Sequence, residues 1–224
     1  MNQQTNNGKT SIVVSHQDLH RFIRDVLVTQ GASKNDAGIV ADGLVWANLR
    51  GVDGHGVSRL PNYLAIIKRG EIDTRVQPKL VHDRPASFVI ESSHGFGPVA
   101  GMQAATIAVE RAKKIGICFG LVRETTHTGA IGRYAQWIAQ QNCAALILGA
   151  GPALMAYHGL RVRSMATSPI AIAVPNRNGT ILLDMATSTI SNGKILQAKQ
   201  TGEPLPAGTV LTAEGEPTTD ARKA

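Results

Sequence analysis

The segment Asp53-Gly-His-Gly-Val-Ser-Arg-Leu60 places an imidazole, His55, and a guanidinium, Arg59, four residues apart in a glycine-flanked turn before a predicted helix. The planar fork of an arginine matches both oxygens of a carboxylate and stays charged at any working pH. A solvated arginine at a helix start is the alternative, but the helix dipole disfavours a cation there. The motif therefore predicts a binding site for a small carboxylate.

A second imidazole, His127, lies between small residues in Thr126-His-Thr-Gly129. An imidazole that titrates near neutrality can donate or accept a proton. A lone histidine is more often structural, because its ring nitrogens can bind nearby backbone groups. Two histidines in matching contexts favour proton transfer.

The remaining histidines give no comparable signal. His16 and His20 are one helical turn apart, but Gln17 stands where a zinc protease needs glutamate, so we interpret them as a solvated face and predict no metal site. Three other histidines have no evident partners and are interpreted as structural: His82, His94 and His158.

The amino-acid composition limits which binding partners and which cellular compartment are expected. The net charge of +7 suits an anionic partner, but the basic residues are scattered and aromatic residues make up only 4% of the chain, so we expect no nucleic-acid binding. The two cysteines, Cys118 and Cys143, lie in apolar runs without CxxC spacing, which predicts reduced core residues. Residues 1–10 have no signal-peptide pattern, and no apolar run approaches the ~20 residues of a membrane span. We therefore expect a cytoplasmic protein with no membrane partner.

The first part of the chain is predicted to be helical. Ser15 is a candidate N-cap for a helix that ends near Gly31, and Ser33 with Asp36 predicts a capping box for a second helix to about Arg50. A third helix is expected after the Gly-His-Gly turn. Their predicted inward side chains are Leu19, Phe22, Ile23, Val26 and Leu27, then Ala37, Val40, Ala41, Leu44 and Val45, then Leu60, Tyr63, Leu64 and Ile67.

After Pro78 the pattern becomes α/β. Short apolar runs predict strands at 87–90, 117–122, 144–148, 170–174 and 180–183, with helices at 99–114 and 130–141. The Asn176-Arg-Asn-Gly179 turn predicts an antiparallel hairpin between the last two strands. We divide the chain into a helical unit, residues 1–75, and an α/β domain, residues 76–224, which becomes loop-like after Thr201.

Three further patterns could contact a ligand. Two glycine-rich turns, 95–101 and 149–151, approximate a dinucleotide fingerprint, but the spacing fails in each, so close helix packing is the alternative. Asp184-Met-Ala-Thr-Ser188 ends a strand with an acid and hydroxyl residues that could bind ribose or phosphate oxygens. A strand-end aspartate that merely caps the next element is the alternative.

Taken in order, four motifs resemble the malate/L-lactate dehydrogenase family of the non-Rossmann type, and the resemblance covers nearly the whole chain. They are Asp53–Leu60, Thr126–Ile131, Thr167-Ser-Pro169 with the following Ile-Ala-Ile-Ala-Val-Pro175, and Asp184–Ser188.

The resemblance implies an NAD- or NADP-dependent dehydrogenase or reductase acting on the CH–OH group of a small 2-hydroxy or 2-oxo carboxylate, or on a related imine. It implies an α/β fold with α+β character: residues 1–75 as a helical substrate and dimerisation unit, and residues 76–224 as a cofactor domain whose largely antiparallel sheet is flanked by helices. It also implies a homodimer.

By position, the resemblance assigns acid/base roles to His127 and His55 and carboxylate binding to Arg59. It assigns binding of the nicotinamide nucleotide to Asp184, Met185, Ala186, Thr187 and Ser188.

Departures from the family pattern at Gly54, Thr126, Thr128, Ala150 and Gly151 leave substrate identity and the choice between NAD and NADP open. Because relatives continue past the equivalent of Ala224, we expect a C-terminally truncated copy. A non-catalytic fragment that only binds nucleotide or a partner is the alternative function.

Overall fold

The computed structural model describes residues 2–6 and 9–224, with side chains described from Val13 onward. The chain forms two compact units: residues 1–104 with 119–129, and residues 105–118 with 130–224. The first unit thus contains strands as well as helices. Residues 1–75 were predicted to be helical, which was wrong for residues 2–6 and 9–13, because they form a pair of antiparallel strands. The division into a substrate unit and a cofactor domain concerns function and stays a prediction. Part of the expectation for residues 1–10 falls on positions 1, 7 and 8, outside the described residues.

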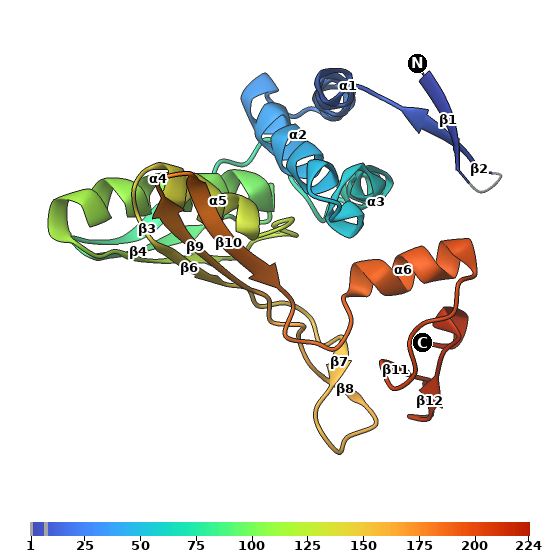
Figure 1. The fold of residues 1–224 in the computed structure, drawn as a ribbon. Helices are drawn as coiled ribbons and strands as arrows, with labels where there is room; N and C mark the ends of the chain where they lie inside the picture. Colours follow the sequence, from blue (N-terminus) through green and yellow to red (C-terminus); the bar gives the residue numbers. More distant parts are fainter. Residues whose placement is uncertain (1, 7–8) are drawn as a thin grey trace. The chain divides into compact units, whose positions relative to one another are not determined.

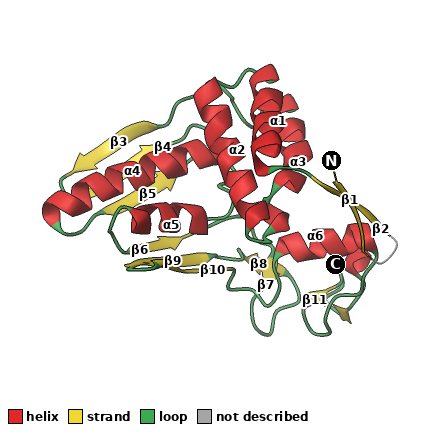
Figure 2. Ribbon diagram, turned by 45° about the horizontal axis from the view of Figure 1, so that its top comes forward, coloured by secondary structure: helices red, strands yellow, loops and turns green. Residues whose placement is uncertain are grey.

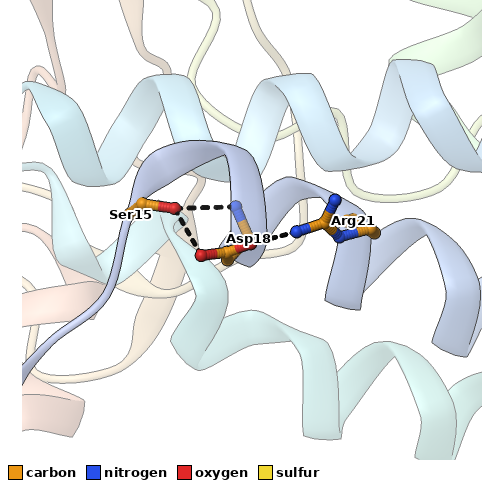
Figure 3. Close-up of polar contacts among 3 residues, drawn as sticks. All are labelled: Ser15, Asp18 and Arg21. Atoms are coloured by element: carbon orange, nitrogen blue, oxygen red, sulfur yellow. Dashed lines mark hydrogen bonds and ion pairs between the residues drawn. The ribbon is translucent and has the colours of Figure 1, made fainter. Parts of the chain in front are cut away.

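Three helices, α1 (His16–Thr29), α2 (Lys34–Leu49) and α3 (Leu60–Lys68), form the helical part of the first unit (Figure 1). Ser15 caps α1 as predicted: its Oγ accepts the Asp18 N–H at 3.1 Å and donates to Asp18 Oδ2 at 2.7 Å, and Arg21 pairs with the same carboxylate (Figure 3). Ser33 caps α2 in the same way through the Asp36 N–H. The Asp36 carboxylate, however, accepts from Gln77 Nε2 at 2.7 Å.

The helices share one hydrophobic core. Every inward residue predicted for α2 is buried, as are Ile23, Leu27, Leu60 and Tyr63. Phe96 and Val99 join this core from farther along the chain. The prediction was wrong for Phe22, which is 57% exposed. Phe22 lies outside the hydrophobic core cluster, at the edge of the apolar face of α1.

A three-stranded sheet completes the first unit, in the order β3-β4-β5: β3 (Lys79–Arg84), β4 (Ser87–Glu91) and β5 (Phe119–Arg123). β3 pairs antiparallel with β4, and β4 pairs parallel with β5. β3 was missed because its six residues are all exposed and mostly polar. The helix α4 (Gly97–Ile115) follows β4, as predicted from residue 99 onward.

The second unit contains the antiparallel sheet β10-β9-β6, from β6 (Ala145–Leu148), β9 (Ile170–Asn176) and β10 (Gly179–Met185), with α5 (Gly132–Gln140) against one face (Figure 2). The predicted hairpin is confirmed, with Val174 opposite Ile181. Ala171 and Ala173 are fully buried on the face beneath α5, whereas Ile172 and Val174 on the other face are 39% and 37% exposed. Small residues at the covered positions let a helix lie close to the strand.

The other elements are one further helix, short strands and 3-10 turns. They are β1 (Asn2–Asn6), β2 (Lys9–Val13), two 3-10 turns at Asp53–His55 and Val57–Arg59, β7 (Met155–Ala156), β8 (Arg163–Met165), α6 (Asn192–Thr201), β11 (Val210–Leu211), β12 (Pro217–Thr218) and a last 3-10 turn at Ala221–Lys223. The mixed α/β class with largely antiparallel sheets is as expected.

Cys118 and Cys143 are free, but both are only partly buried and each precedes a strand, so the prediction of core residues was wrong. Their sequence runs are apolar, yet the strands begin one or two residues later. Within the described part of the chain, none of the helices has the length and apolar character needed to cross a bilayer.

Candidate active site

The turn that carries His55 and Arg59 is held by Asn48 from the last helical turn of α2. Asn48 Nδ2 donates to Asp53 Oδ1 at 2.6 Å, and Asn48 Oδ1 accepts the Val57 N–H at 2.8 Å. A Cβ on Gly56 would lie 2.5 Å from the Asn48 side chain, so glycine is required for this approach. One amide side chain thus fixes the path of both 3-10 turns.

Arg59 is the residue immediately before α3. Its Nε donates to the Gly54 carbonyl at 2.6 Å, and burial lowers the pKa of the guanidinium. None of the carboxylates among the described residues forms an ion pair with it, although five other arginines pair with Asp or Glu. A half-buried cation without a counter-ion is suited to an anionic ligand.

The loop that carries His127 is fastened to the turn before α4. Thr126 Oγ1 donates to the Gly95 carbonyl at 2.8 Å and accepts the Gly97 N–H at 3.1 Å. A Cβ on Gly97 would lie 2.5 Å from the Thr126 carbonyl oxygen and 2.6 Å from that of His127. The first glycine-rich pattern therefore serves close backbone packing, which was the alternative to a dinucleotide fingerprint.

Three rings from two distant parts of the sequence meet in the first unit. The imidazoles of His55 and His127 stack with centroids 5.2 Å apart and planes within 9°. The Tyr63 hydroxyl of α3 lies 2.8 Å from His127 Nδ1, and the two rings meet edge-on at 5.8 Å. The structure thus brings together His55, His127 and, through its charge, Arg59.

Burial determines the charge of these groups. It lowers the pKa of His127 to about 3, with further lowering by His55 and Arg59, and it lowers the pKa of His55 to about 4, with further lowering by Arg59. The expectation that the imidazoles titrate near neutrality was wrong for the ligand-free chain. Both rings are neutral at pH 7 because burial excludes water and the positive charge of Arg59 opposes a second charge nearby.

His55 Nδ1 is buried and forms no hydrogen bond with any described residue. Such an orphaned polar atom costs free energy and calls for a specific explanation. It is typical of a site that a bound polar group completes.

The sequence pattern missed two contributors to this site. Tyr63 was predicted only as an inward core residue, and Asn48 was not singled out. The four-residue spacing from His55 to Arg59 and from Arg59 to Tyr63 places them in successive turns, which is the one signal that could have identified Tyr63.

The strand-end segment 184–188 belongs to the second unit. Asp184 Oδ2 accepts the Gly132 N–H at the start of α5 at 2.8 Å. Burial against α5 raises the pKa of the Asp184 carboxyl, and the bond from Gly132 opposes this rise. Thr187 Oγ1 donates to the Thr167 carbonyl at 3.0 Å, and Ser188 Oγ donates to the Ile190 carbonyl at 2.7 Å.

This segment has the chemistry to fit a nicotinamide nucleotide. Asp184 Oδ1 has no hydrogen-bond partner among the described residues, and the Thr187 and Ser188 oxygens retain lone pairs that can accept from ribose hydroxyls. Met185 is 49% exposed and offers an apolar surface to a flat ring.

Two other histidines differ from expectation. His20, interpreted as solvated, lies 3.0 Å from the Asp42 carboxylate, and His94, for which no partner was evident, lies 3.5 Å from that of Glu124. Both partners lie in parts of the chain distant in sequence, so the local sequence pattern could not predict them.

Across residues 2–6 and 9–224, no three His, Cys, Asp or Glu residues gather in a way that could hold a metal ion. A hollow of about 430 Å³ beside α1, lined by Phe22 and Val26 among others, contains none of the candidate residues.

The structure thus combines a mixed α/β architecture with a stacked histidine pair and an arginine that has no carboxylate partner among the described residues. The family model for malate/L-lactate dehydrogenase matches residues 14–224. The chain therefore belongs to the malate/L-lactate dehydrogenase family.

Individual relatives agree with this assignment. A malate dehydrogenase of Pyrococcus abyssi is 36% identical over 203 residues, which cover 91% of this chain and 56% of the relative. The solved sulfolactate dehydrogenase of Methanocaldococcus jannaschii has a TM-score of 0.83 at 34% identity, and the match covers 95% of this chain and 62% of that one. The solved delta1-piperideine-2-carboxylate reductase of Pseudomonas syringae has a TM-score of 0.84 at 27% identity, with 95% and 64% covered. The chain thus spans roughly three fifths of the length of these relatives.

Proposed function

We propose that this protein is a nicotinamide-dependent oxidoreductase that interconverts a small 2-hydroxy carboxylate and its 2-oxo form. Membership of the family supports the reaction class. The observation that carries the proposal is Arg59, which has no carboxylate partner in the part of the chain that the structure describes and lies in one unit with two stacked neutral imidazoles. These are the groups that a carboxylate-bearing substrate and a proton transfer require.

In this proposal Arg59 binds the substrate carboxylate through its guanidinium nitrogens, while its Nε remains on the Gly54 carbonyl. Because one donor is already fixed, the fork has little freedom and orients the carboxylate. The carbon that reacts lies next to that carboxylate, so Arg59 also positions the reacting bond.

His127 exchanges the proton. A neutral imidazole accepts the hydroxyl proton when the alcohol is oxidised and returns it to the carbonyl oxygen in the reverse reaction. A carboxylate bound at Arg59 offsets the positive charge that lowers the pKa of His127, so it favours the protonated ring. His55 stacks on this ring and offers a second polar contact through its orphaned Nδ1.

When bound, the nicotinamide cofactor supplies the hydride acceptor or donor at its C4 position. Asp184, Thr187 and Ser188 are proposed to hold its ribose hydroxyls, with Met185 and Ala186 beside the nucleotide. Nothing in these side chains distinguishes NAD from NADP, so either is proposed.

The substrate class follows from the same site. Malate and sulfolactate, named for the relatives, are both hydroxy acids, and the related reductase is named for a cyclic imine carboxylate. We propose a 2-oxo acid as the preferred oxidised substrate and keep the imine acid as a second arm of the test. We also propose that the protein forms a homodimer and that it is cytoplasmic. The two free thiols are consistent with a reducing compartment.

The proposal is tested by following the absorbance of NADH or NADPH after mixing the protein with pyruvate, oxaloacetate, sulfopyruvate or a cyclic imine carboxylate. We expect oxidation of at least one reduced cofactor, and a loss of about 10²- to 10⁴-fold in kcat for His127→Ala. His158→Ala is the matched control because that residue is exposed in the second unit. No turnover with any pair, or full activity of His127→Ala, would contradict the proposal.

A further inference from the structure

We propose that Tyr63 is a positioning residue that holds Nδ1 of His127 and thereby reserves Nε2 as the nitrogen that exchanges the proton with substrate. The inference rests on the proposed function and extends it to a residue outside the four family motifs. It begins from one contact, the 2.8 Å separation between the Tyr63 hydroxyl and His127 Nδ1.

The direction of this hydrogen bond follows from its surroundings. Tyr63 is 1% exposed, and the hydroxyl has no other partner among the described residues. If His127 Nδ1–H donated to the phenol oxygen, the phenol hydrogen would be left buried without an acceptor, which is costly. Burial raises the pKa of Tyr63, so the phenol keeps its hydrogen. The phenol therefore donates to Nδ1.

A neutral imidazole has one ring proton and one acceptor nitrogen. Because Nδ1 accepts from Tyr63, the ring proton lies on Nε2 in the ligand-free chain. That form presents an N–H to a carbonyl oxygen. When the ring gains a proton, Nδ1 carries it and donates to the phenol oxygen. Nε2 can then give its proton to the carbonyl oxygen, which leaves the neutral ring with its proton on Nδ1. In the oxidation direction, this form of the ring accepts the hydroxyl proton at Nε2. A hydroxyl holds the ring in both states, which a phenylalanine cannot do.

The edge-on contact gives the orientation a second support. Tyr63 meets the His127 ring at 64°, and His55 stacks on the same ring at 9°. His127 is thus held by one neighbour across its face and by one at Nδ1. Removing the phenol oxygen alone leaves the stacked contact and the aromatic volume in place.

The test is Tyr63→Phe, observed by nitrogen NMR of ring-labelled histidine at pH 7. The His127 signals are assigned by their loss in His127→Ala. We expect wild type to show Nδ1 as a hydrogen-bonded acceptor and Nε2 as protonated, and Tyr63→Phe to shift Nδ1 towards a free acceptor. Tyr157→Phe is the matched control, because Tyr157 is 58% exposed and belongs to the second unit.

In steady-state kinetics we expect kcat of Tyr63→Phe to fall about 3- to 10-fold with little change in KM, because the variant loses one neutral hydrogen bond. A proton on Nδ1 in wild type, or an unchanged Nδ1 signal in Tyr63→Phe, would overturn the proposal. So would a KM rise with unchanged kcat. The NMR arm needs no turnover, so failure of the dehydrogenase proposal and failure of the Tyr63 proposal give different results.

Discussion

His55 and His127 stack face to face, with ring centroids 5.2 Å apart and planes within 9°. Two positive charges at this separation repel one another, and burial removes the water that would screen them. The pair therefore tolerates no more than one charge, and in the ligand-free chain at neutral pH it has none.

Acid should destabilise the first unit through this pair. The folded pKa values, about 4 for His55 and about 3 for His127, lie below the value of about 6.5 expected for an unfolded histidine. The unfolded chain then binds more protons, so the contribution to stability is fully present above pH 6.5 and is lost as pH falls towards 3.

Urea unfolding at pH 7, 6 and 5 measures this effect. Between pH 6 and 5 each ring contributes at most about 1.4 kcal/mol per pH unit. The slope should be smaller in His127→Gln and unchanged in His16→Gln, whose residue is exposed on α1. An equal slope in wild type and His127→Gln would contradict the pKa assignment.

Replacing Arg59 should separate binding from proton chemistry. Arg59→Lys keeps the charge but loses the fork, and we expect KM for the oxo acid to rise roughly 10-fold, about 1.4 kcal/mol, with a smaller change in kcat. Arg59→Met removes the charge, which should raise the pKa of His127 in an NMR titration. Arg21→Met on the surface of α1 is the control, and an unmoved His127 titration in Arg59→Met would contradict the coupling.

The bond between Asp184 and Gly132 should stabilise the second unit. Asp184→Ala leaves the Gly132 N–H without its acceptor, and we expect a loss of about 1 kcal/mol in the free energy of unfolding, at the low end because the bond is only partly buried. Asp184→Asn retains an accepting oxygen and should lose less. Equal losses in the two variants would show that the carboxylate charge, and not the hydrogen bond, matters.

Gly97→Ala should disturb the His127 loop, because the new Cβ would lie 2.5 Å from the Thr126 carbonyl oxygen and 2.6 Å from that of His127. The backbone must move, so we expect a destabilisation of about 1–3 kcal/mol and a weaker Tyr63–His127 contact by NMR. Gly38→Ala in α2 is the matched control, since its added Cβ would meet no atom within 4 Å apart from its own helix backbone and chain neighbours. It should stabilise the helix by about 0.5–1 kcal/mol. Wild-type stability in Gly97→Ala would show that the loop adapts freely.

Local chemistry predicted most of the elements. The serine caps at 15 and 33, the helices that follow them and the hairpin at 176–179 depend on interactions within a few residues, and each is present in the structure. Strand β3 and the short pairs β7–β8 and β11–β12 were missed, because their pairing depends on partners and not on an apolar run.

The candidate site divides in the same way. By itself the sequence determined which residues have the right chemistry, since His55, Arg59 and His127 stand out by type and by their glycine-rich surroundings. Only the tertiary structure decided their protonation state and their hydrogen-bond partners. The contact of Tyr63 with His127 spans 64 positions of sequence, and the neutral charge of both imidazoles comes from burial among residues of separate elements. Desolvation and long-range hydrogen bonds depend on what surrounds a side chain in space, which no local pattern specifies.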